Sequence, residues 1–363
     1  MLTIKAPLEY LSEPGIIAHA GSYIAKYGKR AVVVGSKTSF QVAGQPLLDS
    51  LTEHGITYTT HLFEGFPSES AFSPIQTAVR SFQADTIIGL GGGRVLDTVK
   101  VVGDREALSV VAIPTIAATC AAWASVTIVY DEEGTMIDVA PNTNSPKLIL
   151  ADTQIIAAAP ERYLKAGIVD TLAKFYETEP NLAVDGELLT LNQTVNTAQL
   201  AYRELTQYLD ETLADLRSGT VTRRVTNAID AVIYLAGLVG SITSNFYGGF
   251  AHSFYNVVTS VPGTRDRLHG ERVAFGLLIQ FVLEGKSKAE IARELRIFRK
   301  LDQPLTLEAI GFPEKDEATL ERVASELLAY LPSVKFLSGL DAAAIKAAIH
   351  RADEIGKTDL REA

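Results

Sequence analysis

The chain has 363 residues, of which 47% are hydrophobic and 21% are charged, as is typical of a globular protein with a large core and two domains. Its 33 basic and 43 acidic residues give a net charge of −10, which argues against nucleic acid as a partner because no basic stripe is available to neutralise phosphates. The longest apolar runs, such as 110–116, are far shorter than the about 20 residues that a spanning helix needs, so we expect no membrane association. The single cysteine, Cys120, and a start at Met1 without an apolar core predict a cytoplasmic protein.

Short apolar strands alternate with helices over the first 159 residues. The predicted strands cover 30–35, 56–63, 86–90, 109–113, 126–130 and 147–151. The predicted helices among them cover 40–54, 70–82 and 94–102. This order indicates a mostly parallel sheet, whose ligands lie beyond the carboxyl ends of its strands.

A glycine-rich segment joins the predicted strand 86–90 to the helix that follows it. From Ala84 to Asp97 the chain reads ADTIIGLGGGRVLD, and Gly91, Gly92 and Gly93 lack the Cβ atoms that would prevent a tight turn. A pyrophosphate could then approach the unpaired N–H groups at the positive end of the helix. The glycines are more crowded than in the pattern G-x-G-x-x-G, so the motif alone is equally compatible with a tight turn that binds no ligand.

The second half of the chain has a different pattern. From Arg162 onward, apolar residues recur at helical spacing, and Pro or Gly occurs mainly between long segments. We therefore expect an α/β domain over 1–159, with a Rossmann-like parallel sheet, and an all-α domain over 160–363.

Three potential metal ligands occur in the predicted helical domain: Asp170, His252 and His269. The chain has six histidines, and two of them flank the loop that contains Pro262-Gly263, so the second could turn back toward the first. One carboxylate and two imidazoles suit zinc or iron and leave coordination positions open for substrate. On spacing alone, a helix-capping aspartate and hydrogen-bonded core histidines are the more common explanation.

Four motifs, in this order, resemble the iron-containing alcohol dehydrogenase superfamily and specifically its glycerol dehydrogenase branch. They are GLGGGRVLDTVK at 89–100, IPTIAAT at 113–119, AGIVDTLAK at 166–174 and HGERVAFG at 269–276. The segments PTIAATCAAW at 114–123 and AGIVDTLAKFYE at 166–177 are most similar to the hydroxycarboxylate dehydrogenase subgroup. The similarity covers almost the whole chain and implies a dehydroquinate synthase-like fold that commonly forms homo-oligomers.

The resemblance also implies the roles of individual residues. Asp170, His252 and His269 would hold one divalent metal, zinc in preference to iron, at the cleft between the domains. The metal would polarise the oxygen of a small-molecule substrate while hydride passes to or from a nicotinamide. The implied dinucleotide contacts are Gly92, Gly93, Arg94, Asp97, Thr115, Thr119, Val126 and Tyr130.

Two residues, Cys120 and Tyr255, depart from the glycerol dehydrogenase pattern near the implied substrate. Cys120 stands where those enzymes have an aspartate that binds the polyol, and a thiol cannot accept two hydroxyl hydrogen bonds as a carboxylate does. Trp123 adds bulk near the same turn. Tyr255 replaces a histidine three residues after His252; it shares that helical face and could donate a hydrogen bond or join a proton relay, although a phenol is a weaker base than imidazole at neutral pH.

Cofactor preference depends on the residues after the first predicted strand. NAD-preferring members have an acidic residue there, whereas this chain has Ser36 followed by Lys37. Serine does not repel a 2′-phosphate and lysine could pair with it, so we predict NADP(H) in preference to NAD(H). An ordinary solvated turn that still accommodates NAD is the alternative.

Together these features predict a metal-dependent oxidoreductase that transfers hydride between the dinucleotide and a small hydroxy acid or 2-oxo acid. The substrate carboxylate would need a cation, and Arg265 and Arg267 are local candidates, although two loop arginines are more often solvated. One alternative is a glycerol or other polyol dehydrogenase. A second is a dehydroquinate synthase-like lyase, which would need a larger basic cluster to hold a phosphate or phosphonate. A third is a dinucleotide-binding protein without catalysis, favoured if the three metal ligands lay too far apart.

Overall fold

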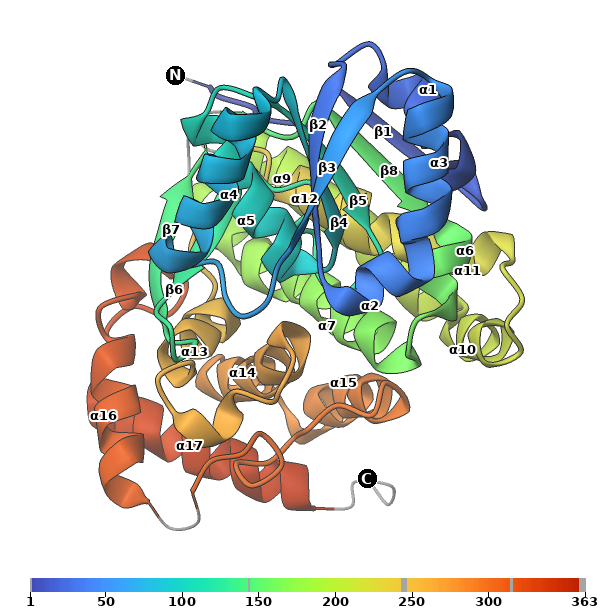
Figure 1. Ribbon diagram of the computed structural model, residues 1–363. Coiled ribbons are helices and arrows are strands. Elements are labelled where there is room, and N and C mark those ends of the chain that lie inside the picture. The colour runs from blue at the N-terminus through green and yellow to red at the C-terminus, as the bar shows by residue number, and fades with distance from the viewer. Residues whose placement is uncertain (1, 143, 243–246, 314–315, 359–363) are drawn as a thin grey trace. The chain divides into compact units, whose positions relative to one another are not determined.

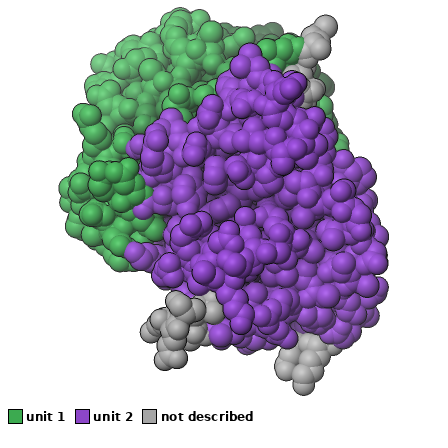
Figure 2. All heavy atoms as spheres, turned by 180° about the vertical axis from the view of Figure 1, so that it is seen from behind, with its two compact units in different colours: residues 1–164, 207–243 green, residues 165–206, 244–363 purple. Residues whose placement is uncertain are grey.

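The computed structural model describes residues 2–142, 144–242, 247–313 and 316–358. The chain forms two compact units, which are coloured separately in Figure 2. Unit 1 comprises 1–164 and 207–243, and unit 2 comprises 165–206 and 244–363. The segment 207–243 therefore groups with the α/β part of the chain, while a division into folding domains between 159 and 160 stays a prediction.

Unit 1 contains a six-stranded parallel sheet and a separate two-stranded antiparallel hairpin (Figure 1). The strands are β1 (Glu9–Glu13), β2 (Arg30–Gly35), β3 (Thr57–Leu62), β4 (Thr86–Gly91), β5 (Ser109–Pro114), β6 (Val126–Tyr130), β7 (Met136–Pro141) and β8 (Leu148–Asp152). The order in the sheet is β1-β8-β5-β4-β2-β3, and each neighbouring pair is parallel. The predicted parallel sheet is confirmed. The segment 126–130 is a strand as predicted, but it pairs with β7 in the hairpin, and neither β7 nor β1 was predicted from the sequence.

Helices of unit 1 precede, follow and connect these strands. They are η1 (Ile16–His19), α1 (Ala20–Ile24), α2 (Lys37–Ser39), η2 (Phe40–Gly44), α3 (Gln45–Glu53), α4 (Glu69–Phe82), α5 (Gly93–Arg105), α6 (Thr153–Ala158), α10 (Leu209–Arg217), α11 (Arg223–Asp230), η4 (Ala231–Leu235) and α12 (Ala236–Val239). The predicted helices at 40–54, 70–82 and 94–102 correspond to η2 with α3, to α4 and to α5.

Strand β2 shows why both faces of the sheet are apolar. Ala31 and Val33 contribute to a core that includes side chains of α1 and α3, whereas Val32 and Val34 contribute to a second core with side chains of α4 and α5. Side chains alternate along a strand, so a strand covered on both faces reads as a continuous apolar run. The sequence RAVVVG is such a run, and all of its residues after Arg30 are buried.

The register aligns the carboxyl ends of three central strands. Gly35 of β2 lies opposite Leu90 of β4, and Gly91 of β4 lies opposite Pro114 of β5. The residues that follow these strands therefore meet at one edge of the sheet, which is where ligands of open parallel sheets bind.

Contacts with β1 explain why 207–243 packs with unit 1. The hydroxyl of Tyr10 on β1 donates a hydrogen bond of 2.6 Å to Asp230 at the end of α11. The Tyr10 ring also packs against Trp123 and Tyr234, with ring centroids 5.8 and 6.1 Å away.

Unit 2 is helical over its described residues. Two long helices, α7 (Glu161–Thr178) and α9 (Leu189–Gln207), lie almost entirely in it. The others are η3 (Glu179–Asn181), α8 (Leu182–Asp185), α13 (Phe250–Val258), η5 (Pro262–Thr264), α14 (His269–Leu283), α15 (Lys288–Lys300), α16 (Glu317–Leu327), η6 (Leu331–Ser333) and α17 (Ala342–Lys357). Helix α14 packs against α13 and α17, and Phe275 and Phe281 on it are fully buried. Within the described ranges, no helix is both long enough and apolar enough to cross a membrane.

Candidate functional site

Three charged side chains project from one face of α7 in unit 2. Asp170, Lys174 and Glu177 are separated by four and three residues, so they lie one above another along the helix. Asp170 is 1% exposed and Glu177 is 5% exposed, whereas the Lys174 side chain is 20% exposed. Buried charges are stable only when paired and hydrogen-bonded, so the partners of these groups define a site.

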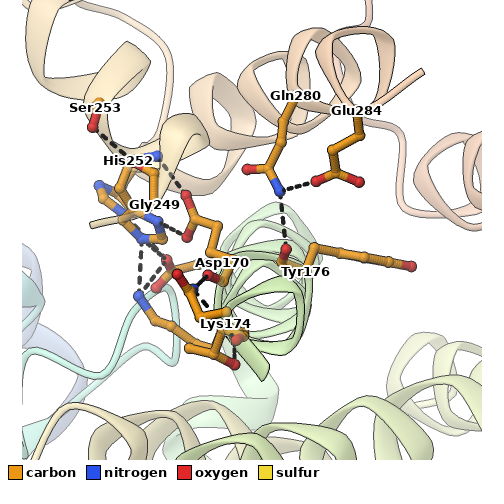
Figure 3. Close-up of polar contacts among 12 residues, drawn as sticks. Asp170, Lys174, Tyr176, Gly249, His252, Ser253, Gln280 and Glu284 are labelled. Carbon is orange, nitrogen blue, oxygen red and sulfur yellow. Dashed lines mark hydrogen bonds and ion pairs between the residues drawn. The ribbon is translucent and has the colours of Figure 1, made fainter. Parts of the chain in front are cut away.

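Two histidines from α13 and α14 meet Asp170. His252 lies in the first turn of α13, and its Nε2 atom is 3.0 Å from Asp170 Oδ1 (Figure 3). His269 is the first residue of α14, and its Nε2 atom is 3.1 Å from the same oxygen. The three potential ligand atoms all lie within 4.8 Å of one another. The fold thus brings together the three residues that the sequence suggested as metal ligands.

Two glycines permit this approach between helices. A Cβ atom on Gly270 would lie 1.9 Å from the carbonyl oxygen of Ala166, so only glycine lets the start of α14 pack against the backbone of α7. A Cβ atom on Gly249 would lie 2.0 Å from the carboxyl group of Glu177. The positions of His269 and His252 beside Asp170 therefore depend on these glycines.

Glu177 fixes the orientation of His252. Its Oε1 atom accepts the backbone N–H of His252 at 2.9 Å, and its Oε2 atom lies 2.5 Å from Nδ1 of the same residue. With Nδ1 donating to the carboxylate, Nε2 faces Asp170. A carboxylate that holds the remote nitrogen is the usual support of a histidine that binds metal.

The two buried carboxylates of the cluster have lowered pKa values because cationic groups lie beside them. Burial alone would raise the pKa of the Asp170 carboxyl, but Lys174 and the two histidines hold it well below its usual range. Burial also opposes ionisation of Glu177, yet His252 and Lys174 lower its pKa. Burial lowers the pKa of His269 more than Asp170 raises it, whereas for His252 the effect of burial is outweighed by Glu177 and the pKa is raised. Asp170 thus presents an anionic oxygen to the two Nε2 atoms, whereas Glu177 lies on the Nδ1 side of His252.

Lys174 lies beside two of the potential metal ligands. Its Nζ atom lies 2.9 Å from His252 Nε2 and 3.5 Å from Asp170 Oδ1 (Figure 3). One carboxylate oxygen and two imidazole nitrogens are ligands suited to zinc or iron. The donor set therefore fits a divalent metal.

Tyr255 lies one helical turn after His252 and is 3% exposed. Its ring meets the ring of His269 edge to face, with centroids 4.1 Å apart, and the guanidinium of Arg272 lies 4.6 Å from its centroid. Tyr255 thus helps to hold His269 in place. Its part in a proton relay stays a prediction.

Sequence reasoning assigned no role to Lys174 or Glu177, although both lie in the quoted segment 166–177. The available signal was their spacing from Asp170, since residues four and seven positions later lie on the same helical face. The contacts of Glu177 depend on α13, which is more than 70 residues away in sequence, and no local pattern reveals them.

The glycine-rich segment lies at the carboxyl edge of the sheet in unit 1. Strand β4 ends at Gly91 and α5 begins at Gly93, and the N–H of Thr115 donates to the Gly91 carbonyl at 3.1 Å. The guanidinium of Arg94 lies over the ring of Phe66, 4.0 Å from its centroid. The start of α5 therefore lies at the carboxyl edge of the sheet, and its contact with a pyrophosphate stays a prediction.

Ser36 and Lys37 follow β2 at the same edge. Ser36 is the N-cap of α2, and its Oγ atom accepts the N–H of Ser39 at 3.1 Å. Lys37 is exposed. No negatively charged side chain stands at either position, and the preference for NADP(H) remains to be tested.

Asp97 pairs with Lys100 inside unit 1. Their Oδ1 and Nζ atoms are 2.8 Å apart, and the lysine is 2% exposed. Lys100 also donates to the carbonyl groups of Ala121, Ala124 and Val126 at 2.6 to 3.0 Å. This buried pair anchors the turn that contains Cys120; a contact between Asp97 and a dinucleotide is still only predicted.

The remaining predicted contacts lie in this turn and the hairpin after it. Thr119 Oγ1 accepts the N–H of Ala121 at 3.2 Å, and Cys120 is half-buried. Val126 and Tyr130 are the first and last residues of β6. Trp123 is 7% exposed, and its Nε1 atom donates to Ser241 at 2.9 Å. The ring of Trp123 is thus packed within its own unit, and its contact with substrate stays a prediction.

Arg265 and Arg267 lie just before α14 and are half-buried. Among the described residues, neither guanidinium contacts Asp170, His252 or His269, and the Nε atom of Arg265 is buried without a hydrogen-bond partner. The structure does not join these arginines to the ligand cluster.

Comparison with known proteins identifies the family. The model of the family described as iron-containing alcohol dehydrogenase matches residues 7–153. The chain is 31% identical to a glycolaldehyde reductase of Halobacterium salinarum over 88% of each protein, and 31% identical to hydroxycarboxylate dehydrogenase A of Escherichia coli over 92% of each. Its structure matches the crystal structure of a probable glycerol dehydrogenase from Sinorhizobium meliloti with a TM-score of 0.88 and 25% identity, covering 98% of this chain and 99% of that one. The resemblance seen in the motifs is confirmed: the chain belongs to the iron-containing alcohol dehydrogenase family, whose members are oxidoreductases that act on CH–OH groups.

Proposed function

We propose that this protein transfers hydride between NADP(H), in preference to NAD(H), and a small 2-oxo acid or the corresponding hydroxy acid. Asp170, His252 and His269 would hold one divalent metal, zinc in preference to iron. The convergence of their ligand atoms within 4.8 Å is the observation that carries the proposal. When bound there, the metal supplies a Lewis acid for the substrate oxygen.

The residues around the ligands hold them in position. Glu177 keeps the imidazole of His252 turned so that Nε2 faces the centre, and Tyr255 supports the ring of His269. Such outer contacts set the geometry of a metal site and matter about 10- to 100-fold in affinity or activity. The same convergence removes the reason to favour a dinucleotide-binding protein without catalysis.

The edge of the sheet supports dinucleotide binding. The N–H groups at the start of α5 would donate to a pyrophosphate, and the end of β2, which pairs with β4, lies at the same edge of the sheet. Ser36 and Lys37 in place of an acidic residue support the phosphorylated dinucleotide.

Two observations favour a 2-oxo acid over a polyol. Cys120 lacks the carboxylate that would accept the hydroxyl hydrogen bonds of glycerol. The similarity to a hydroxycarboxylate dehydrogenase points the same way. A polyol dehydrogenase is the alternative, in line with the names of other relatives, whereas a lyase of the dehydroquinate synthase type loses support because Arg265 and Arg267 do not join the cluster. Homo-oligomeric assembly and a cytoplasmic location stay predictions.

The test measures the turnover of a panel of substrates by the change in nicotinamide absorbance. For the unmodified protein with NADPH, we expect kcat/KM for at least one of glyoxylate, pyruvate or 2-oxobutanoate to exceed that for dihydroxyacetone by about tenfold or more. Cys120→Asp should shift this ratio toward dihydroxyacetone, because a carboxylate repels the anionic substrate and accepts hydroxyl hydrogen bonds. Cys120→Ser, which adds no charge, is the control. Rapid glycerol oxidation by the unmodified protein without turnover of any 2-oxo acid would overturn the proposal.

A further inference from the structure

Lys174 has no role in the hydride transfer proposed above, yet it stands among the ligands. It follows Asp170 by one helical turn, and its Nζ atom is 3.5 Å from Asp170 Oδ1 and 2.9 Å from His252 Nε2. The Lys174 side chain is 20% exposed, while that of Asp170 is 2% exposed. The ammonium thus lies beside the ligand atoms, close to any substrate oxygen that approaches them.

The charges of the cluster indicate which class of substrate it attracts. Lys174 places a positive charge beside Asp170, and a divalent metal held by Asp170, His252 and His269 would add two more. An anionic substrate is attracted by these cations, whereas a neutral polyol gains nothing from their charge.

The contacts of Lys174 point to the same substrate class. A nitrogen lone pair that binds metal cannot also accept a hydrogen bond, so metal binding removes the contact between Lys174 and His252 Nε2. In a 2-oxo acid the carboxylate is bonded directly to the reacting carbonyl carbon, so a substrate whose carbonyl oxygen approaches the metal ligands brings an anionic acceptor close to the ammonium. Charge-assisted hydrogen bonds of this kind are among the strongest in proteins.

We propose that the ammonium of Lys174 binds the carboxylate of the substrate and thereby selects small monoanionic 2-oxo acids over neutral carbonyl compounds and polyols. The inference rests on the proposed function, because it assumes that the substrate oxygen approaches Asp170, His252 and His269. It assigns to Lys174 the task that sequence reasoning gave to Arg265 and Arg267, neither of which contacts the cluster.

The decisive experiment compares pyruvate with its neutral isostere pyruvamide. In Lys174→Met, the ratio of kcat/KM for pyruvate to that for pyruvamide should fall by about 30-fold or more relative to the unmodified protein, as expected for the loss of a hydrogen bond between charged groups. Lys174→Arg keeps the charge and should retain most of the ratio. Lys288→Met, on the exposed start of α15, makes the same change in net charge away from the cluster and should leave the ratio unchanged.

Two readouts do not depend on turnover. The unreactive anion oxamate, titrated calorimetrically into zinc-loaded protein, should bind Lys174→Met about tenfold or more weakly than the unmodified protein. Zinc content per chain should be at least as high in Lys174→Met, because removal of a nearby positive charge favours a cation. Circular dichroism checks that each variant is folded.

The outcomes separate the two proposals. An unmodified protein that turns over only neutral substrates contradicts the proposed function, whatever the variants do, and the oxamate titration then tests the anion site by itself. A protein that reduces pyruvate, but whose pyruvate-to-pyruvamide ratio and oxamate affinity are the same in Lys174→Met, contradicts the role of Lys174 alone. Loss of zinc from Lys174→Met would also overturn it, since Lys174 would then support the metal rather than the substrate.

Discussion

Ser36 stabilises the local fold, but this role does not determine whether NADP(H) or NAD(H) is preferred. Its hydroxyl caps α2 by accepting the N–H of Ser39, so a side chain with an oxygen at this distance is needed for the local structure. Aspartate meets that requirement equally well, because both residues are preferred N-caps. The fold therefore does not require an uncharged residue at this position. This supports the explanation that the missing negative charge serves cofactor binding.

Ser36→Asp tests this explanation. The variant should remain folded, with a thermal midpoint close to that of the unmodified protein, while its carboxylate repels a 2′-phosphate. We expect the ratio of kcat/KM for NADPH to that for NADH to exceed one in the unmodified protein and to fall by about tenfold or more in the variant. Ser36→Thr, another cap without charge, is the control. An unmodified protein that uses NADH equally well, or a ratio that does not respond to the new carboxylate, would refute the preference.

Only some residues of the proposed metal site could be predicted from the sequence. The ligands Asp170, His252 and His269 could be proposed because their motifs resemble a known family. Glu177 and Lys174 could not be assigned roles, because their partners become visible only when α13 packs against α7. Side-chain contacts between distant helices are tertiary facts that spacing within one helix does not contain.

The start of α5 is the element on which dinucleotide binding depends. A methyl group on Gly92 would lie 2.7 Å from Ile116, so Gly92→Ala would disturb the protein itself as well as the approach of a ligand. A methyl group on Gly93 would meet Ala121 at 3.4 Å, an ordinary contact. Gly93→Ala is therefore the cleaner probe of this helix end.

We predict that Gly93→Ala weakens NADP⁺ binding by about tenfold or more, because the added methyl group obstructs the approach of a pyrophosphate to the backbone N–H groups. Fluorescence titration measures the affinity. Gly103→Ala is unsuitable as a control, since its Cβ would lie 2.2 Å from Val110, whereas Gly55 has open space around it but a positive φ. The matched control is Ser70→Ala on the exposed start of α4. Unchanged NADP⁺ affinity in Gly93→Ala would argue against this location of the pyrophosphate.

Elements with strong local patterns were predictable and those defined by pairing were not. Strands β2, β4 and β5 are buried apolar runs and were predicted to within one residue. Strand β1 has charged ends and pairs with β8, which is about 140 residues later, so nothing local marks it. Strand β7 is largely exposed, so its sequence has no apolar alternation from which the antiparallel pairing with β6 could be predicted.

For the whole molecule, helical periodicity predicted that the second half is helical, but it did not predict which of these helices pack with unit 1. The segment 207–243 is helical, as expected, yet it packs with unit 1 through β1 and the ring of Tyr10. An apolar helical face does not specify which partner buries it. By contrast, all three proposed metal ligands, together with Glu177 and Lys174, belong to unit 2, so the centre is formed within a single unit.

The most direct test of the metal-dependent site is the metal content of the purified protein, measured by elemental analysis together with its activity. We predict about one zinc or iron ion per chain in the unmodified protein and more than about a 100-fold loss of activity in His269→Ala, which should also lose the metal, because a ligand matters more than its supporting contacts. His350→Ala, which removes a part-exposed histidine paired with Glu317, should keep both metal and activity. Full activity after the metal has been removed, or a His269→Ala variant that retains both metal and turnover, would contradict the account.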